Sequence, residues 1–151
     1  MPEKTMETMV HELADLEAIR GLTYRYAHHV WRKEGPQIAT DLYADDGVYD
    51  NGRVVTRGKE ALLEYYRDVG RRGTGPGPFP YVHNHVIDLQ GDRATGYCYM
   101  DQRTTVDDRG VIGGGCYEDA YVRVGDGWRF QSRTYRQLFT LAAGDIVETT
   151  R

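Results

Sequence analysis

The chain has 151 residues, of which 40% are hydrophobic and 28% are charged, and its formal net charge is −4. This balance is typical of a single folded domain rather than a disordered chain. Acidic and basic residues are interspersed without a basic stripe that could neutralise phosphates, which argues against nucleic-acid binding. The apolar stretches are too short to span a membrane, and the N-terminus lacks the apolar core of a secretion signal. We therefore expect a soluble cytoplasmic protein with no membrane partner.

Cysteine and tyrosine use narrows the kinds of site to expect. Cys98 and Cys116 are the only cysteines, and neither lies in a Cys-x-x-Cys pair or a Cys/His cluster. A metal site is therefore not expected, and both thiols are interpreted as packing residues. Twelve tyrosines stand against three phenylalanines and two tryptophans. A ring with a polar tip suits a half-wet cavity better than a dry core, so the composition favours a tyrosine-rich pocket.

Helical periodicity dominates the first half of the chain. Apolar residues at three- and four-residue steps predict an amphipathic helix over residues 13–30, which Gly35-Pro36 is expected to end. A short second helix over residues 38–43 is expected to stop at the Asp-Asp-Gly turn of residues 45–47. The Asp-Asn-Gly sequence at residues 50–52 predicts a hairpin turn, because Asn-Gly tolerates positive φ.

A third helix is predicted over Glu60–Val69, followed by a glycine- and proline-rich loop over residues 70–80. From Tyr81 the apolar period changes to two, and four long antiparallel strands are expected: Tyr81–Gln90, Arg93–Val106, Gly113–Val124 and Trp128–Thr140. Helices first and hairpin-linked strands afterwards predict an α+β fold in one domain over residues 1–151. Residues 1–10 and 141–151 are expected to be flexible or to contact another subunit.

Five stretches carry a resemblance to a known family: LADLEAIRGLTYRYA, DLYADDGVYDNG, RGKEALLEYY, NHVIDLQGDRATGY and CYEDAYVRVGDGWRF. In this order they resemble the SnoaL-like branch of the nuclear-transport-factor-2-like superfamily. The resemblance implies a cone-shaped barrel in which three N-terminal helices pack on a strongly curved antiparallel sheet, with a pocket between the first helix and the sheet. It also implies a homo-oligomer, as relatives form dimers or trimers.

Known members of the superfamily include scytalone dehydratase, bile-acid 7α-dehydratase, lindane dehydrochlorinase, ketosteroid isomerase and polyketide cyclases, beside proteins with no known chemistry. The fold alone therefore leaves the function open. The lyases of the group mostly work without cofactor or metal, and many carry an Asp late in the first helix and a His at the start of the first long strand. Those positions correspond here to Trp31 and Pro80. The usual dyad cannot be carried over, and catalysis would need other groups.

Candidate residues on the first helix follow from its geometry. Tyr24, Ala27, His28 and Trp31 form a second stripe, which we place about a quarter-turn from the apolar one and facing the cavity. His28 is then a candidate base, Tyr24 and Trp31 are candidate substrate contacts, and His29 faces outward. The alternative is that His28 is an ordinary interfacial histidine and that Trp31 only fills space.

The first long strand carries a second histidine pair. Strand alternation places His83 and His85 on one face and Asn84 on the other. A neutral imidazole is a good general base near pH 7, and His83 is favoured because it lies nearer the expected cavity mouth. A histidine pair on an exposed sheet face or at a subunit contact is an equally simple explanation.

The remaining candidates lie on strands. Alternation places Met100 and Gln102 on one face of their strand, and the resemblance implies that this face meets the substrate. By the same resemblance, Tyr49 and Tyr117 match pocket residues, with Asp119 on the same face as Tyr117. Arg133 matches an arginine that supports developing negative charge, and its guanidinium suits a phenolate or carboxylate ligand. Tyrosines at strand spacing are also ordinary packing residues, so only part of this set is expected to touch a ligand.

Three functions remain open. The first is a cofactor-independent lyase, a dehydratase or a related eliminating enzyme such as a formaldehyde-releasing one, acting on a small hydrophobic aromatic hydroxylated substrate by His/Tyr acid–base catalysis. In that case His28 or His83 takes a proton, Tyr49 or Tyr117 donates to the leaving group, and Arg133 stabilises negative charge. The second is an isomerase or cyclase on a similar substrate, and the third is a small-molecule-binding module without catalysis.

Overall fold

The computed structural model describes residues 4–69, 78–107 and 109–144. Its helical elements are α1 (Met6–Arg32), α2 (Gly35–Gln37), a π-helical turn η1 (Ile38–Leu42) and α3 (Lys59–Val69). Its strands are β1 (Tyr43–Asp50), β2 (Val55–Arg57), β3 (Phe79–Gln90), β4 (Arg93–Val106), β5 (Arg109–Val124) and β6 (Gly127–Gly144). The α+β class is confirmed.

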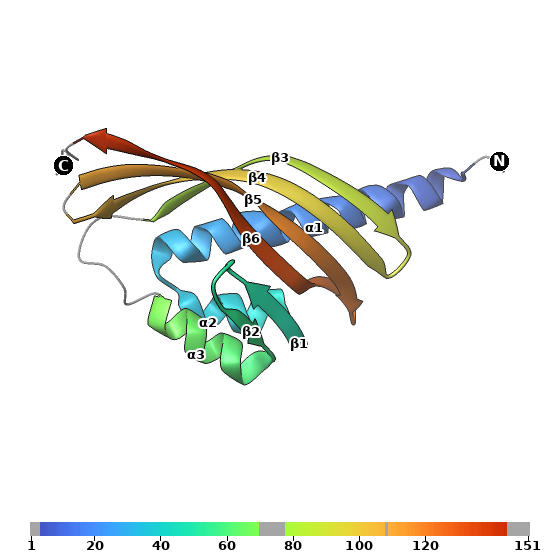
Figure 1. The fold of residues 1–151 in the computed structure, drawn as a ribbon. Coiled ribbons are helices and arrows are strands. Elements are labelled where there is room, and N and C mark those ends of the chain that lie inside the picture. The colour runs from blue at the N-terminus through green and yellow to red at the C-terminus, as the bar shows by residue number, and fades with distance from the viewer. Residues whose placement is uncertain (1–3, 70–77, 108, 145–151) are drawn as a thin grey trace.

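The strands form one six-stranded sheet with the order β2-β1-β6-β5-β4-β3. Strands β3 to β6 are an antiparallel meander, whereas β1 pairs in parallel with β6 and antiparallel with β2. In Figure 1, α1 runs along one face of the long strands, and α2, α3 and the β1–β2 hairpin gather beside its C-terminal half. The strong curvature expected of the sheet stays a prediction.

The predicted strands are confirmed, with ends that differ by a few residues. β3 begins at Phe79 and not at Tyr81, so Pro80 is part of the strand. The hairpin turn at residues 50–52 is also confirmed, because Asp50 pairs with Val55 across it. The loop predicted over residues 70–80 falls mostly on residues 70–77, which lie outside the described residues.

The end of the second helix was predicted wrongly. The chain is already extended at Tyr43, and residues 45–47 lie inside β1, where the β1–β6 register shifts between Tyr43 and Val48. The side chains of Tyr43 and Tyr49 are both buried, so packing against the core, rather than the turn propensity of Asp and Gly, decides the conformation here.

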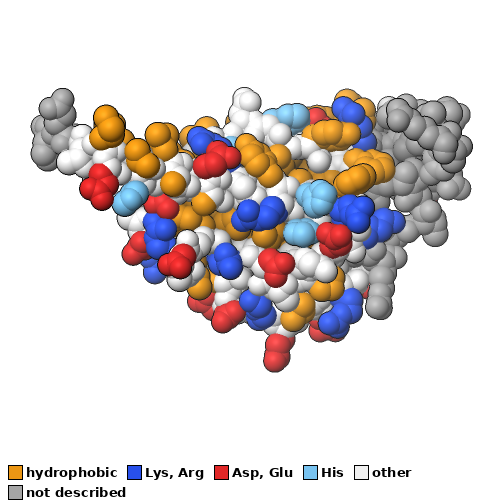
Figure 2. Space-filling model, turned by 180° about the vertical axis from the view of Figure 1, so that it is seen from behind, with side chains coloured by type: hydrophobic (Ala, Val, Ile, Leu, Met, Phe, Trp, Pro, Cys, Tyr) orange, Lys and Arg blue, Asp and Glu red, His pale blue; other side chains and the backbone are white. Residues whose placement is uncertain are grey.

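Both ends of the described chain belong to long elements, α1 at the N-terminal side and β6 at the C-terminal side. Residues 6–10 form the first turns of α1, which Thr5 caps by accepting a hydrogen bond from the backbone N–H of Thr8. The last residues of β6 reach Gly144, whereas residues 1–3 and 145–151 lie outside the described part. Apolar side chains of Met6, Val10 and Leu13 are exposed along this N-terminal half of α1, which Figure 2 shows from behind.

The core lies where α1 crosses the sheet. Ile19, Leu22 and Tyr26 of α1 are buried against the strands, with Phe130 of β6 and Leu62 of α3 in the same cluster. These α1 residues recur at three- and four-residue steps, so the helix buries one narrow stripe and leaves its opposite side in solvent. No described helix combines the length and the apolar character needed to cross a membrane.

Candidate functional site

A cavity of about 360 Å³ opens beside the C-terminal end of α1. Its walls come from α1, the β1–β2 hairpin, α3 and the long strands, and its volume is in the range of small-ligand pockets. Six tyrosines line it: Tyr26, Tyr49, Tyr65, Tyr66, Tyr117 and Tyr135. The expected tyrosine-rich pocket is therefore present, and both Tyr49 and Tyr117 belong to its wall.

The tyrosine rings pack against one another. The ring of Tyr49 lies 5.3 Å from that of Tyr65 and 5.5 Å from that of Tyr66, between centroids. Burial raises the pKa of Tyr26, Tyr49 and Tyr66 well above that of an ordinary phenol, and it raises the pKa of Tyr117 as well. These hydroxyls therefore stay protonated at any physiological pH, and the single proton of Tyr66 is donated to the hydroxyl of Tyr26.

A histidine and a carboxylate meet at this cavity. His29 lines it, and its Nδ1 lies 2.8 Å from Oε2 of Glu34. Their side chains are 17% and 33% exposed. The hydrogen bond to His29 is the main reason that the pKa of Glu34 is lowered. Burial acts to raise this pKa, and the hydrogen bond to Arg32 acts to lower it further. An ionised carboxylate only accepts, so Nδ1–H of His29 donates to Glu34, and in the neutral ring the lone pair is then on Nε2. That tautomer is the one a general base needs.

The backbone at the end of α1 brings this pair together. Lys33 adopts the left-handed conformation with φ 58°, and its N–H donates back to the carbonyls of His29 and Val30. The N–H of Glu34 also bonds to the carbonyl of His29. This helix end reverses the chain and returns the carboxylate of Glu34 to the imidazole one turn earlier.

The orientation predicted for the first helix was wrong. His28, Tyr24 and Trp31 are exposed, whereas His29 faces the pocket. At about 100° per residue, His28 lies about 200° from Tyr26, and His29 lies about 60° from it. The stripe that carries His28 is thus on the solvent side, nearly half a turn from the buried stripe rather than a quarter-turn.

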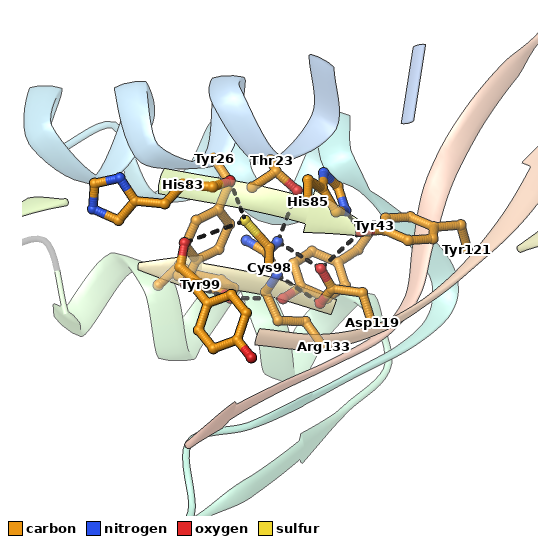
Figure 3. Close-up of polar contacts among 11 residues, drawn as sticks. Thr23, Tyr26, Tyr43, His83, His85, Cys98, Tyr99, Asp119, Tyr121 and Arg133 are labelled. Carbon is orange, nitrogen blue, oxygen red and sulfur yellow. Dashed lines mark hydrogen bonds and ion pairs between the residues drawn. The ribbon is translucent and has the colours of Figure 1, made fainter. Parts of the chain in front are cut away.

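A buried polar network is centred on Arg133 and Asp119 (Figure 3). Arg133 donates from Nε and Nη2 to the two carboxylate oxygens of Asp119 at 2.9 and 2.8 Å, and from Nη2 to Oγ1 of Thr23 at 3.0 Å. Tyr121 donates to the same carboxylate at 2.8 Å and lies 3.0 Å from Nε2 of His85. Both charged side chains of the ion pair are 0% exposed.

The guanidinium of Arg133 is enclosed by aromatic rings. Its central carbon lies 3.9 Å from the ring centroid of Tyr117, 4.1 Å from Phe130 and 4.4 Å from Tyr26. Burial acts to lower the pKa of Arg133, but Asp119 outweighs it and the pKa is raised. Neither Arg133 nor Asp119 is among the described residues that line the cavity. Both residues therefore lie outside the cavity wall, against the expectation that they meet the substrate, and Asp119 compensates the charge of Arg133.

The two histidines of β3 face opposite sides of the sheet, against the expectation from simple alternation. The β3–β4 register shifts between Val82 and His85, so three steps along β3 match two along β4. His83 is exposed on the outer face, where its Nε2 lies 2.8 Å from Oδ2 of Asp101. His85 is half-buried on the inner face, and burial lowers its pKa. The bulge thus removes His83 from the cavity.

On β4 only one of the two candidates reaches the cavity. Gln102 lines the cavity, whereas Met100 is buried in the core without reaching the cavity. Gln102 pairs with Pro80 of β3 and Gly113 of β5, which sets its amide between two strands at the pocket wall. Among residues 4–69, 78–107 and 109–144, no cluster of three or more His, Cys, Asp and Glu side chains could hold a metal ion.

The sequence of residues 11–134 matches the model of the SnoaL-like domain. The chain belongs to the SnoaL-like family. Comparison with curated proteins found no match for this SnoaL-like chain.

Solved structures share the fold of this SnoaL-like domain. A hexachlorocyclohexane dehydrochlorinase from Novosphingobium barchaimii superposes with a TM-score of 0.81 at 17% identity, over 94% of this chain and 99% of that one. A candidate scytalone dehydratase from Novosphingobium aromaticivorans gives 0.75 at 22%, over 92% and 97%. A protein of unknown function from Mycobacterium tuberculosis gives 0.78 at 24%, over 89% and 78%. An NTF2-like protein is also similar, so the NTF2-like fold is confirmed.

The SnoaL-like pocket of this chain differs from the expected pattern at two positions. Trp31 and Pro80, the positions that the family resemblance assigns to the usual Asp–His dyad, line one surface hollow together with His28, and Pro80 also lines the main cavity. They are neighbours in space, as a dyad would require, but neither can transfer a proton. His29 and Glu34 are the acid–base pair that the structure places at the main cavity. A carboxylate five residues after a histidine, immediately before the helix stop at Gly35-Pro36, is the sequence signal that could have revealed them.

Proposed function

We propose that this protein is a cofactor-independent lyase that eliminates water from a small, hydrophobic, aromatic hydroxylated compound. The observation that carries the proposal is the hydrogen-bonded His29–Glu34 pair at the edge of a cavity lined by six tyrosines. A base with a fixed tautomer and a set of neutral hydroxyl donors are the two components that such an elimination requires. The fold shared with a dehydrochlorinase and a candidate dehydratase supports the choice of an elimination.

His29 acts as the base in this proposal. Its Nε2 removes a proton from the carbon next to the one that bears the hydroxyl, the electron pair of that C–H bond forms the C=C bond, and the C–O bond breaks. The imidazolium then gives the same proton to the departing hydroxide, which leaves as water. Atoms and charges balance, and His29 returns to its neutral form. Glu34 is a positioning residue that holds the tautomer and stabilises the imidazolium while it exists.

The tyrosines hold the leaving hydroxyl and the aromatic ring. Tyr49 and Tyr117 face the cavity with hydroxyls that burial keeps protonated, so each can donate to an oxygen that gains negative charge. Arg133 lies under the ring of Tyr117 and strengthens this wall without contacting the ligand. It therefore supports the site from behind instead of binding the substrate directly.

Product analysis on a panel of aromatic secondary alcohols tests the proposal. Wild-type protein should release one water from at least one member, which mass spectrometry detects as the corresponding mass loss. His29→Gln should reduce the rate by about 10²- to 10⁴-fold, the usual contribution of a general base. The matched control is His28→Gln, the adjacent exposed histidine, which should retain the wild-type rate. Equal rates in all three proteins would refute the assignment of His29.

The same panel separates the other two functions. A product of unchanged mass would indicate an isomerase or cyclase, which needs the base but no leaving group. Binding without any product would indicate a non-catalytic module, a reading that Trp31 and Pro80 at the dyad positions favour. Either result would overturn the lyase proposal.

A further inference from the structure

Two permanently cationic side chains line the cavity. Lys33 and Arg53 are part of its wall, whereas no Asp or Glu lines it among the residues that the structure describes. Glu34 bonds to His29 but is not itself part of the wall. The whole chain has the opposite balance, with a net charge of −4. The positive character of the cavity is therefore a local property that the overall composition does not predict.

Lys33 and Arg53 hold charges that this part of the protein leaves uncompensated. Within residues 4–69, 78–107 and 109–144, neither forms an ion pair, whereas Lys59 pairs with Asp45 at 3.0 Å. Both backbones are fixed. Lys33 occupies the left-handed helix end, and the N–H of Arg53 donates to Oδ1 of Asn51 in the hairpin turn. Two fixed points from separate elements thus present cations at one cavity.

We propose that the cavity selects an organic anion, namely an aromatic carboxylate. The carboxylate lies at Lys33 and Arg53, and the ring lies among the tyrosines. The inference rests on the proposed function only in sharing its site, for which it names the substrate class. It also moves the recognition of negative charge from Arg133, whose charge Asp119 already compensates, to the two exposed cations at the cavity.

Calorimetric titration with a matched pair of probes tests this inference. The probes are trans-4-hydroxycinnamate and its methyl ester, which differ in the carboxylate charge. Wild-type protein should bind the acid about tenfold more tightly than the ester. Lys33→Met and Arg53→Met should each weaken binding of the acid about two- to fivefold, as expected for partly exposed charge pairs, and leave the ester unchanged. Added salt should weaken the binding of the acid and leave the binding of the ester unchanged.

One control variant completes the design. Arg57→Met removes an exposed cation of the same hairpin that does not line the cavity, and it should change neither affinity. Equal or tighter binding of the ester, or an equal effect of Arg57→Met and Arg53→Met on the acid, would overturn the inference.

The outcome is separable from that of the lyase proposal, because affinity is measured without turnover. A preference for the acid in wild type that persists in His29→Gln supports the anion site whether or not any product forms. Elimination from neutral alcohols without a preference for the acid would leave the lyase standing and refute the anion site.

Discussion

Two acid–base pairs in this protein have similar short contacts and different surroundings. Arg133 and Asp119 lie 2.8 Å apart with both side chains fully buried, and His29 and Glu34 lie 2.8 Å apart beside a cavity with both partly exposed. The first pair compensates its own charge behind the tyrosines. The second leaves one ring nitrogen for a ligand. Burial and access, rather than residue type, separate a pair that maintains the fold from a pair that can perform chemistry.

Breaking the buried pair should have the largest effect. Asp119→Ala leaves the guanidinium of Arg133 buried without its carboxylate, which should lower the free energy of unfolding by about 3–5 kcal/mol. Urea denaturation measures this. The control is Glu118→Ala, which removes the neighbouring carboxylate that pairs with Arg136 on the surface and should cost less than about 1 kcal/mol. Similar losses in the two variants would show that burial does not distinguish these carboxylates.

Disconnecting the exposed pair should affect turnover and leave folding nearly intact. Glu34→Ala removes the partner that fixes the His29 tautomer, so kcat should fall about tenfold, less than loss of the base itself, while KM changes little. Steady-state kinetics on the substrate found in the panel provides the measurement, and Glu34→Asp should recover part of the rate. A fall in the free energy of unfolding that accounts for the lost activity would instead make Glu34 structural.

The buried end of the network should produce a pH-dependent stability. Burial lowers the pKa of His85 from 6.5, with Asp119 acting against the shift and Arg133 and Arg20 adding to it. Between the two pKa values the unfolded chain binds a proton that the folded protein does not. The contribution of neutral His85 to the free energy of unfolding is therefore fully present above pH 6.5 and is lost as the pH falls below it. The slope is at most about 1.4 kcal/mol per pH unit for one proton. His85→Gln should flatten this slope in urea denaturation at pH 5.0–7.5, whereas His83→Gln on the outer face should not.

A surface ion pair should have the smallest effect. Lys59 and Asp45 lie 3.0 Å apart, but the side chain of Asp45 is 94% exposed. Asp45→Asn should change the free energy of unfolding by less than about 1 kcal/mol, and added salt should remove even that difference. A loss of several kcal/mol would mean that contact distance alone predicts the energy of a charge pair in this fold.

The fold was predictable because its signals are local and repeated. Period-two runs gave the four long strands, and Asn-Gly marked the hairpin. The site was less predictable, because single irregularities decide it. A bulge near His83 turns that residue outward, and the left-handed conformation of Lys33 returns Glu34 to His29. Neither feature produces a periodic pattern of apolar residues that could be recognised in the sequence. The family resemblance placed Tyr49, Gln102 and Tyr117 at the cavity, because matching positions in related proteins lie at the same points along the strands.

The central claim is that ligands meet His29 in the tyrosine-lined cavity rather than His28 on the opposite side of α1. Histidine-detected NMR of ¹⁵N-labelled protein titrated with trans-4-hydroxycinnamate measures this directly, with His28→Gln and His29→Gln variants to assign the two rings. The account predicts that the ring signals of His29 shift in a saturable manner while those of His28 and His83 stay in place. Saturable shifts of His28, beside the hollow formed with Trp31 and Pro80, and none at His29 would contradict it.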